Sequence, residues 1–294
     1  MGFKLFLFLE KFLMLLPKHL RKAFFTSLSS IAYYLSGRYR KIGFINLDFI
    51  YGDKLTKEQK REIVKYSFRN LLLNFFHLME IRHTPKDELI KKITIKNKEI
   101  VDKIHSQNRA VIYVTPHYCA WEMGGIGIGL FVEHITAIFR KMKNKDYEKW
   151  VIESRESFGN STLEKNGVLK SLINLVKNKK ATGILIDTAM NKREGVEVEF
   201  LGKKIYQTPS PAYLARRYNA AIVPVIMVSE DEENYELVFF DEIEVQKSDN
   251  EKDDIQKATQ LQADWLSSLI YNKPKCWFWV HRRFKGEYPQ IYKK

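Results

Sequence analysis

Short apolar runs rich in β-branched residues alternate along the chain with segments in which apolar residues recur every three or four positions. The runs at 110–116, 135–139, 181–186 and 221–228 predict buried strands, and 235–240 predicts an antiparallel neighbour of the last one. Residues 57–81 and 253–271 predict long amphipathic helices, the first with Thr56 as its N-cap. This alternation predicts a single α/β domain with a central, mostly parallel or mixed sheet flanked by helices.

Two further runs differ from the buried strands in composition. Residues 196–200 alternate valine with glutamate, which predicts an edge strand. Residues 275–280 are strongly aromatic and predict a closing strand near the C-terminus.

The N-terminal residues 3–16 are almost wholly apolar, but Lys4, Glu10 and Lys11 interrupt them and Pro17 ends them. The stretch is shorter than the ~20 residues that a spanning helix needs. Because Lys4, Lys11 and Lys18 share one stripe, we expect residues 1–18 to form a hydrophobic helix that associates with a membrane interface. A signal peptide is a weaker alternative because no small-residue cleavage site follows, and a helix docked on the protein's own core is the other.

The charge of the chain points to anionic partners. Lysine and arginine number 49 against 35 aspartates and glutamates, giving a net charge of +14. A membrane surface, a nucleic acid or an acidic protein would each suit this charge. The aromatic residues lie in apolar runs rather than among the cations, which argues against nucleic acid. The two cysteines, Cys119 and Cys276, lack CxxC spacing and fit a reducing compartment.

A candidate acid/base pair follows the first buried strand. The strand stops at Pro116, and His117 comes next, with Glu122 five positions on in the helix expected to start after Pro116. A histidine acts as a general base when a partner holds its tautomer, and we expect Glu122 to do so. No GxSxG motif is present, so an external hydroxyl would attack directly. A purely structural histidine is the alternative, and no second histidine lies at metal-ligand spacing.

Three other features extend the candidate site. The glycines of residues 123–130 do not follow the GxGxxG spacing, and they predict close helix packing or room for an acyl chain. Arg140 follows the strand 135–139, at the end where open α/β sheets bind ligands. Asp187 follows the buried strand 181–186, where a carboxylate needs a polar partner.

The ordered set of these motifs resembles the bacterial lipid A biosynthesis acyltransferases, the late lauroyl or myristoyl transferases of lipopolysaccharide assembly within the HxxxxD/E superfamily. The chain departs from the family's usual pattern at two places. Cys119 and Ala120 stand where the family often has Gly and Asn, and Thr188 stands where Gln is common. These differences bear on which branch of the family and which acyl donor apply. The resemblance covers nearly the whole chain and is carried by His117 to Glu122, Phe139-Arg140 to Asn144, Arg155 to Gly159, and residues 183–187, 200–208 and 277–284.

The resemblance implies a glycerolipid-acyltransferase-like fold, with residues 19–294 as the acyltransferase domain. It implies transfer of a fatty acyl group from acyl carrier protein to a hydroxyl on an acyl chain of a Kdo-bearing lipid A precursor, with no cofactor and no metal. His117 would be the base and Glu122 its partner. Substrate binding would fall to Arg140, Asn144, Arg155 and Asp187, and Asp187 is expected to orient one of the arginines.

The expected partners are an acidic acyl carrier protein, an anionic lipid A precursor and the cytoplasmic face of the bacterial inner membrane, with peripheral or monotopic association and no nucleic acid. Two alternatives remain at this point. One is a lysophospholipid or phospholipid-mannoside acyltransferase that uses the same base. The other is a non-catalytic membrane-bound lipid-binding protein of the same fold.

Overall fold

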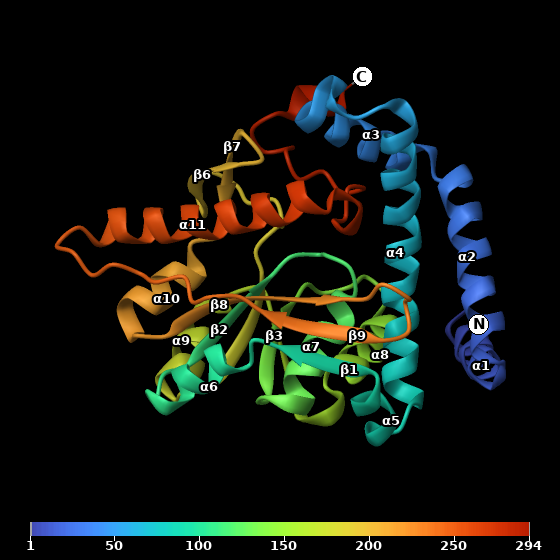
Figure 1. Ribbon diagram of the computed structural model, residues 1–294, viewed down its shortest axis with the longest axis horizontal. Helices are drawn as coiled ribbons and strands as arrows, with labels where there is room; N and C mark the ends of the chain where they lie inside the picture. The colour runs from blue at the N-terminus through green and yellow to red at the C-terminus, as the bar shows by residue number, and fades with distance from the viewer. Residues whose placement is uncertain (1, 294) are drawn as a thin grey trace.

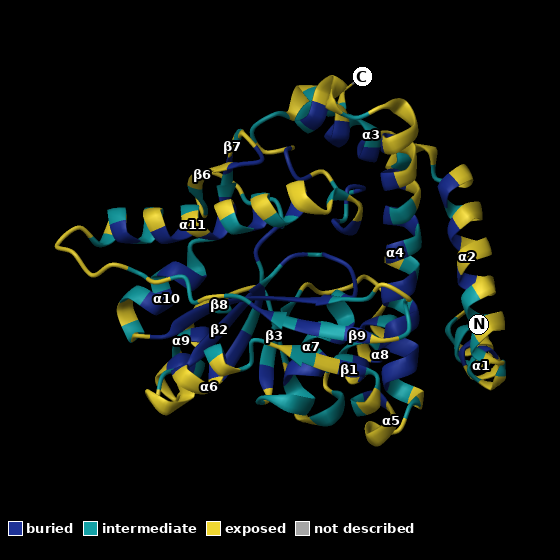
Figure 2. Ribbon diagram, in the orientation of Figure 1, coloured by how far each residue is buried: buried dark blue, intermediate teal, exposed yellow. Residues whose placement is uncertain are grey.

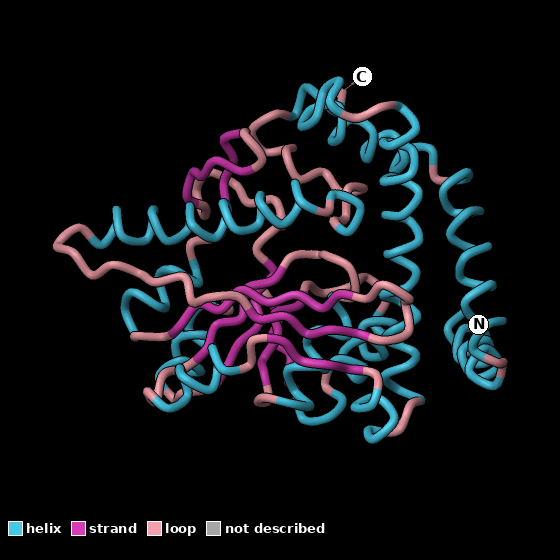
Figure 3. The backbone as a smooth tube through the Cα atoms, viewed as in Figure 1, coloured by secondary structure: helices cyan, strands magenta, loops and turns pink. Residues whose placement is uncertain are grey.

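A seven-stranded sheet forms the centre of the computed structural model, which describes residues 2–293 (Figure 3). The strand order is β1-β9-β8-β2-β5-β3-β4. β1 and β9 run parallel to each other and antiparallel to the other five. The sheet is therefore mixed and mostly parallel, as the sequence predicts. Its strands are β1 (Ile93–Lys96), β2 (Val111–Thr115), β3 (Ile135–Phe139), β4 (Ser161–Glu164), β5 (Ala181–Leu185), β8 (Ala221–Val228) and β9 (Tyr235–Phe239).

Helices cover both faces of this sheet (Figure 1). The central strand β2 is buried on both faces, since Ile112 and Val114 belong to one apolar cluster and Val111 and Tyr113 to another. The strand run is apolar throughout because neither face meets water. The helices around the sheet are α5 (Lys86–Lys91), α6 (Glu99–Ser106), α7 (Trp121–Phe131), α8 (Lys145–Arg155), α9 (Leu169–Lys177) and α10 (Ser210–Tyr218). The helix α11 (Glu251–Asn272) packs against α10.

The longest helix, α4 (Lys57–His83), stands along one side of the domain (Figure 1). Its Asn74 contacts the turn that follows β2. The predicted N-cap is confirmed: Thr56 Oγ1 accepts from Gln59 N at 3.2 Å, and Gln59 Oε1 accepts from Thr56 N at 2.8 Å. This capping box satisfies two backbone donors that a helix start otherwise leaves unpaired.

Two predicted strands take other forms. Residues 196–200 do form a strand, β6 (Val196–Phe200), but it pairs only with β7 (Lys203–Gln207) in a separate two-stranded hairpin. The closing strand predicted at 275–280 is wrong. Pro274–Cys276 is a short 3₁₀ turn, and the next residues run irregularly with a single bridge from Trp277 to Tyr118. The indole rings of Trp277 and Trp279 are fully buried, so the aromatic pattern reports core packing rather than a sheet.

The N-terminal segment forms three helices, α1 (Gly2–Leu15), α2 (Lys18–Leu35) and α3 (Gly37–Tyr51). The predicted N-terminal helix, residues 1–18, begins at Met1, and the predicted acyltransferase domain, residues 19–294, ends at Lys294. These two terminal residues lie outside the described residues. Within residues 2–293, no helix has the length and apolar character that crossing a membrane requires. One face of α1 docks on the protein's own core: Glu10 is buried, and it accepts from Trp150 Nε1 at 3.0 Å and lies 3.1 Å from His83 Nε2.

Parts of α1 and α2 are exposed (Figure 2). Many of these exposed residues are apolar. On α2 they recur at intervals of three or four residues and so form one stripe: Leu20, Phe24, Leu28, Ile31 and Leu35. On α1 they are Leu5, Phe8, Leu9, Phe12 and Leu15. An exposed apolar surface of this extent is typical of an interaction site.

Candidate active site

The turn between β2 and α7 carries His117. Its main chain is held by the aromatic segment, because Phe278 N donates to His117 O at 3.1 Å and Cys119 N donates to Cys276 O at 3.0 Å. Cys119 has a φ of 45°, in the left-handed region. The helix expected directly after Pro116 therefore starts only at Trp121, since these pairings keep residues 117–119 out of a helical conformation.

Asp187 holds the imidazole ring of His117. β2 and β5 are parallel neighbours, so their carboxyl ends deliver His117 and Asp187 to the same edge of the sheet. Asp187 Oδ1 lies 2.9 Å from His117 Nδ1, and Asp187 Oδ2 accepts from His117 N and from Trp277 Nε1, each at 2.9 Å. Three contacts to one fully buried carboxylate fix the ring through Nδ1.

The two charges of this pair shift each other's pKa. Burial lowers the pKa of His117, but the charge and hydrogen bond of Asp187 outweigh it and leave that pKa above its ordinary value. Burial raises the pKa of Asp187, but the charge and hydrogen bonds of His117 outweigh it and hold that pKa well below its usual range. Asp187 is therefore ionised and can accept the Nδ1 proton, which leaves Nε2 as the basic nitrogen.

The prediction that Glu122 holds the His117 ring is wrong. Glu122 lies in the first turn of α7 and forms a bidentate ion pair with Arg155, at 2.6 Å from Nη2 and 2.9 Å from Nε. Trp121 Nε1 donates to the same carboxylate at 3.3 Å. The prediction that Asp187 orients an arginine is also wrong, because its hydrogen-bond partners are His117 and Trp277. The charge of Glu122 still raises the pKa of His117, but within residues 2–293 its carboxylate makes no hydrogen bond to the ring.

Asn74 of α4 holds the start of α7 in place. Its Nδ2 donates to Cys119 O at 2.7 Å, and its Oδ1 accepts from Glu122 N at 3.1 Å. Asn74 is buried, so these bonds replace water for two backbone groups at a helix end. Asn74 lies inside an otherwise amphipathic helix, and its sequence context carries no signal of this role.

Of the other predicted substrate-binding residues, Arg140 and Arg155 line the same cleft as His117, and Asn144 does not. A cleft of about 780 Å³ contains His117, Arg140 and Arg155 among its lining residues. Asn144 does not line this cleft: its Oδ1 accepts from Asp146 N at 3.0 Å and from Tyr147 N at 3.3 Å, so it is the N-cap of α8. Its position directly before an acidic helix start is the usual sequence signal for that role.

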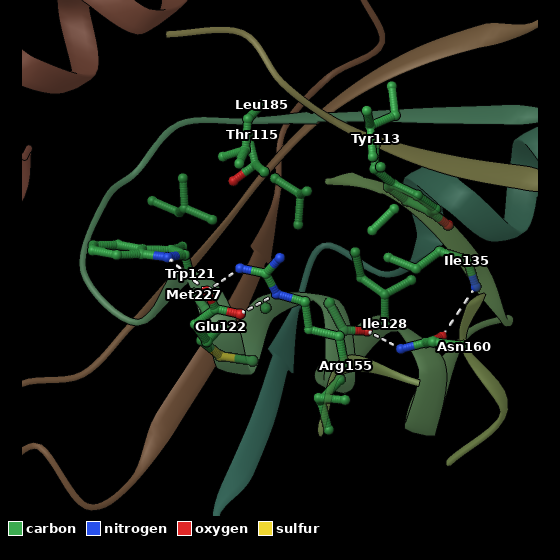
Figure 4. Close-up of a pocket in the computed structure, with 18 residues that line it drawn as sticks. Tyr113, Thr115, Trp121, Glu122, Ile128, Ile135, Arg155, Asn160, Leu185 and Met227 are labelled. Carbon is green, nitrogen blue, oxygen red and sulfur yellow. Dashed lines mark hydrogen bonds and ion pairs between the residues drawn. The ribbon is translucent and has the colours of Figure 1, made fainter. Parts of the chain in front are cut away.

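A smaller apolar cavity of about 100 Å³ adjoins the cleft between α7 and the sheet (Figure 4). Trp121, Glu122 and Arg155 lie at one end of it, and Tyr113 and Asn160 lie at the other. Its wall includes three glycines, Gly124, Gly125 and Gly183, which leave room that side chains would fill. The predicted space beside the glycine-rich segment is therefore present, and Trp121, whose ring packs edge-on against that of His117, lines it.

Three residues of the aromatic C-terminal segment complete the surroundings of Asp187. Trp277 donates to its carboxylate. Burial lowers the pKa of His281 to about 3, so this cleft-lining ring is neutral. Burial also lowers the pKa of Arg283 to about 10, and both of its Nη atoms donate to Tyr206 O at 3.3 Å. The sequence predicts a strand at 275–280, which includes Trp277 but neither His281 nor Arg283, and it predicts no contact of these three residues with Asp187.

These groups can move a proton beside an apolar cavity. The ring of His117 is 25% exposed, and within residues 2–293 its Nε2 has no hydrogen-bond partner, so this nitrogen can meet a hydroxyl in the cleft. The Nη1 atom of Arg155 is not part of the pair with Glu122, and its guanidinium lies where the cleft meets the cavity. Apolar space of this kind suits a hydrocarbon chain.

The fold and this site together place a His–Asp pair at the carboxyl edge of a mixed, mostly parallel sheet, in a cleft that adjoins an apolar cavity. The chain belongs to the bacterial lipid A biosynthesis acyltransferase family, whose profile matches residues 1–286. The chain is 23% identical over 230 residues to the lipid A biosynthesis palmitoleoyltransferase of Escherichia coli (strain K12), covering 78% of this chain and 73% of the relative. The lipid A biosynthesis acyltransferase of Shigella flexneri matches with the same identity and coverage.

A third relative acts on another class of lipid according to its name. The phosphatidylinositol mannoside acyltransferase of Mycolicibacterium smegmatis (strain ATCC 700084 / mc(2)155) is 24% identical over 173 residues. The match covers 58% of this chain and 55% of that relative.

Proposed function

We propose that the protein transfers a fatty acyl group from acyl carrier protein to a hydroxyl on an acyl chain of a Kdo-bearing lipid A precursor. The observation that carries this proposal is the His117 ring, held through Nδ1 by the ionised Asp187 beside an apolar cavity. Membership of the lipid A family and the two enterobacterial relatives support the choice of acceptor.

In the proposed reaction, Nε2 of His117 takes the proton of the acceptor hydroxyl while its oxygen attacks the thioester carbonyl. The negative charge that forms on the carbonyl oxygen is stabilised by Arg155, which Glu122 holds at the mouth of the cavity. The C–S bond then breaks, and the departing thiolate takes the proton from His117. An ester and a free carrier thiol are the products.

The net charge and the exposed apolar surface support the proposed donor and location. A net charge of +14 suits an acidic carrier protein and an anionic membrane. The uncovered apolar faces of α1 and α2 lie on the cytoplasmic face of the bacterial inner membrane as a peripheral contact, without crossing it. The acyl chain of the donor occupies the cavity beside Gly124 and Gly125.

The mycobacterial relative makes a phospholipid mannoside the second candidate acceptor. It would use the same base and the same cavity, so only the acceptor separates the two functions.

The test uses the full chain in mixed lipid–detergent micelles with acyl carrier protein charged with a fatty acid. Transfer to a tetra-acylated, Kdo-bearing precursor is expected, and His117→Ala should lower the rate by about 10²-fold or more. His105→Ala, on the solvent side of α6, is the matched control and should keep the wild-type rate.

Two results would overturn the proposal. Acylation of a phospholipid mannoside or lysophospholipid, with none of the lipid A precursor, would show that the acceptor is wrong. A full rate in His117→Ala would show that the base is wrong.

A further inference from the structure

Two cations stand side by side at the carboxyl ends of β3 and β4. The strands are parallel, and their last paired residues are Phe139 and Glu164. Lys165 N continues the ladder by donating to Phe139 O at 2.8 Å, so Arg140 lies next to Lys165 in register. Like charges at neighbouring positions of adjacent strands repel each other, and this arrangement is unfavourable without a counter-charge.

Both side chains face the site. Arg140 and Lys165 line the cleft that contains His117. Their neighbours Lys141 and Glu164 are absent from that lining and form an ion pair of their own. Glu164 is therefore engaged by Lys141, and within residues 2–293 it makes no ion pair with Arg140 or Lys165.

Within the described residues 2–293, neither Arg140 nor Lys165 makes an ion pair of 4.0 Å or less, although nearby cations such as Lys141 and Lys145 do. Burial lowers the pKa of Lys165, and the charge of Arg140 lowers it further. The charge of Glu194, which also lines the cleft, raises the pKa of Lys165, but by less than the charge of Arg140 lowers it. The pair thus keeps its positive charge unneutralised in a partly enclosed place.

We propose that Arg140 and Lys165 form a binding site for a phosphate group of a substrate, at the edge of the cleft that contains His117. A planar guanidinium and a point-charge ammonium on one side of a cleft bind a phosphate through charge-assisted hydrogen bonds. The carboxyl ends of parallel strands are where open α/β sheets hold such ligands. This inference rests on the proposed function, and it adds Lys165 as a substrate-binding residue.

Two substrates of the proposed reaction carry such a phosphate. One is the sugar phosphate of the lipid acceptor, and the other is the phosphodiester of the carrier protein's pantetheine arm. Lys165→Gln and Arg140→Gln should each raise KM about tenfold for the substrate whose phosphate is bound, and leave kcat nearly unchanged. Lys141→Gln makes the same charge change one residue away and should have no effect.

Paired substrates identify the source of the phosphate. With an acceptor that lacks its sugar phosphates, Lys165→Gln should lose its effect if the lipid is the ligand. With acyl-pantetheine in place of acyl-phosphopantetheine, it should lose its effect if the donor is the ligand. An equal KM defect with every substrate would contradict phosphate recognition by this pair.

A binding measurement keeps the inference separate from the proposed function, because it needs no turnover. Inorganic pyrophosphate should bind the full-length wild type and Lys141→Gln equally, and Lys165→Gln about tenfold more weakly. In phosphate-free, low-salt buffer, Lys165→Gln should melt at a higher temperature than the wild type, because it removes the repulsion. Equal pyrophosphate affinity in all three proteins would overturn the site, whatever lipid the enzyme acylates.

Discussion

The ion pair between Glu122 and Arg155 offers a quantitative test, because it links the first turn of α7 to the last turn of α8 at the mouth of the apolar cavity. Its two charge-assisted hydrogen bonds measure 2.6 and 2.9 Å. Each such bond contributes about 1.5–3 kcal/mol when shielded from water. The side chain of Glu122 is 10% exposed and that of Arg155 is 31% exposed, so solvent screening reduces the total.

From these values we expect a coupling free energy of about 2–3 kcal/mol between the two side chains. The variants are Glu122→Gln, Arg155→Gln and the double variant that combines them. Glutamine keeps the shape of the glutamate side chain, and each substitution removes one charge. Each single variant leaves one charge partly buried and unpaired, so its melting temperature should fall by roughly 4–8 °C. The double variant should be no less stable than either single one.

The assay is urea unfolding of the four proteins, followed by tryptophan fluorescence, with acyl transfer measured in parallel. The matched control is the pair of Glu58 and Arg61 on α4, which makes a 2.8 Å contact between side chains that are 71% and 54% exposed. That pair should show no measurable coupling. If the coupling of Glu122 with Arg155 were equally absent, the ion pair would not be what holds Arg155 at the cavity.

Two further predictions concern the apolar surfaces. Gly125→Leu places a side chain into the cavity, where even a Cβ would lie 3.7 Å from Ile135 Cδ1. When carrier-bound donors of different chain length compete, this variant should prefer shorter acyl chains than the wild type does. An unchanged preference would exclude this cavity as the acyl site. Leu28→Glu interrupts the apolar stripe of α2 and should weaken binding to anionic vesicles about tenfold in a flotation assay. Leu261→Glu on α11, also an exposed leucine, should bind as the wild type does, and equal binding of both variants would exclude the stripe as a membrane contact.

Local pattern was sufficient for α4 and for the strands β2, β3, β5, β8 and β9, but it did not predict β4. The apolar runs of β2, β3, β5 and β8 carry their strand character in consecutive residues, and the Thr56 cap depends only on the next three positions. The space beside Gly125 could also be anticipated from the sequence. Features that depend on a few neighbouring residues can be predicted in this way.

The partners inside the site could not be predicted, because they depend on which strands become neighbours. Asp187 meets His117 only because β5 lies next to β2, 70 residues along the chain. Glu122 is closer to His117 in sequence, but its carboxylate pairs with Arg155, which comes from another helix, α8. In each case a long-range contact overrides the local spacing.

The central claim is that Asp187 keeps the proton of His117 on Nδ1, so that Nε2 can act as the base. Oδ2 of Asp187 accepts two N–H donors, one from His117 N and one from Trp277. In Asp187→Asn the amide oxygen would keep those two donors, and the amide NH₂ would face Nδ1. Nδ1 would then have to accept, which moves the ring proton to Nε2 and removes the base.

The most direct measurement is the pH dependence of kcat/KM for the wild type and Asp187→Asn, with folding checked by circular dichroism. Since His117 must be neutral to accept a proton and Asp187 raises its pKa, the wild-type rate should fall as pH drops through a midpoint above the ordinary 6.5 of histidine. Asp187→Asn should be slower by about 10²–10⁴-fold even on the alkaline plateau, with any remaining acid limb moved to lower pH. An Asp187→Asn enzyme with the wild-type plateau and midpoint would contradict the account.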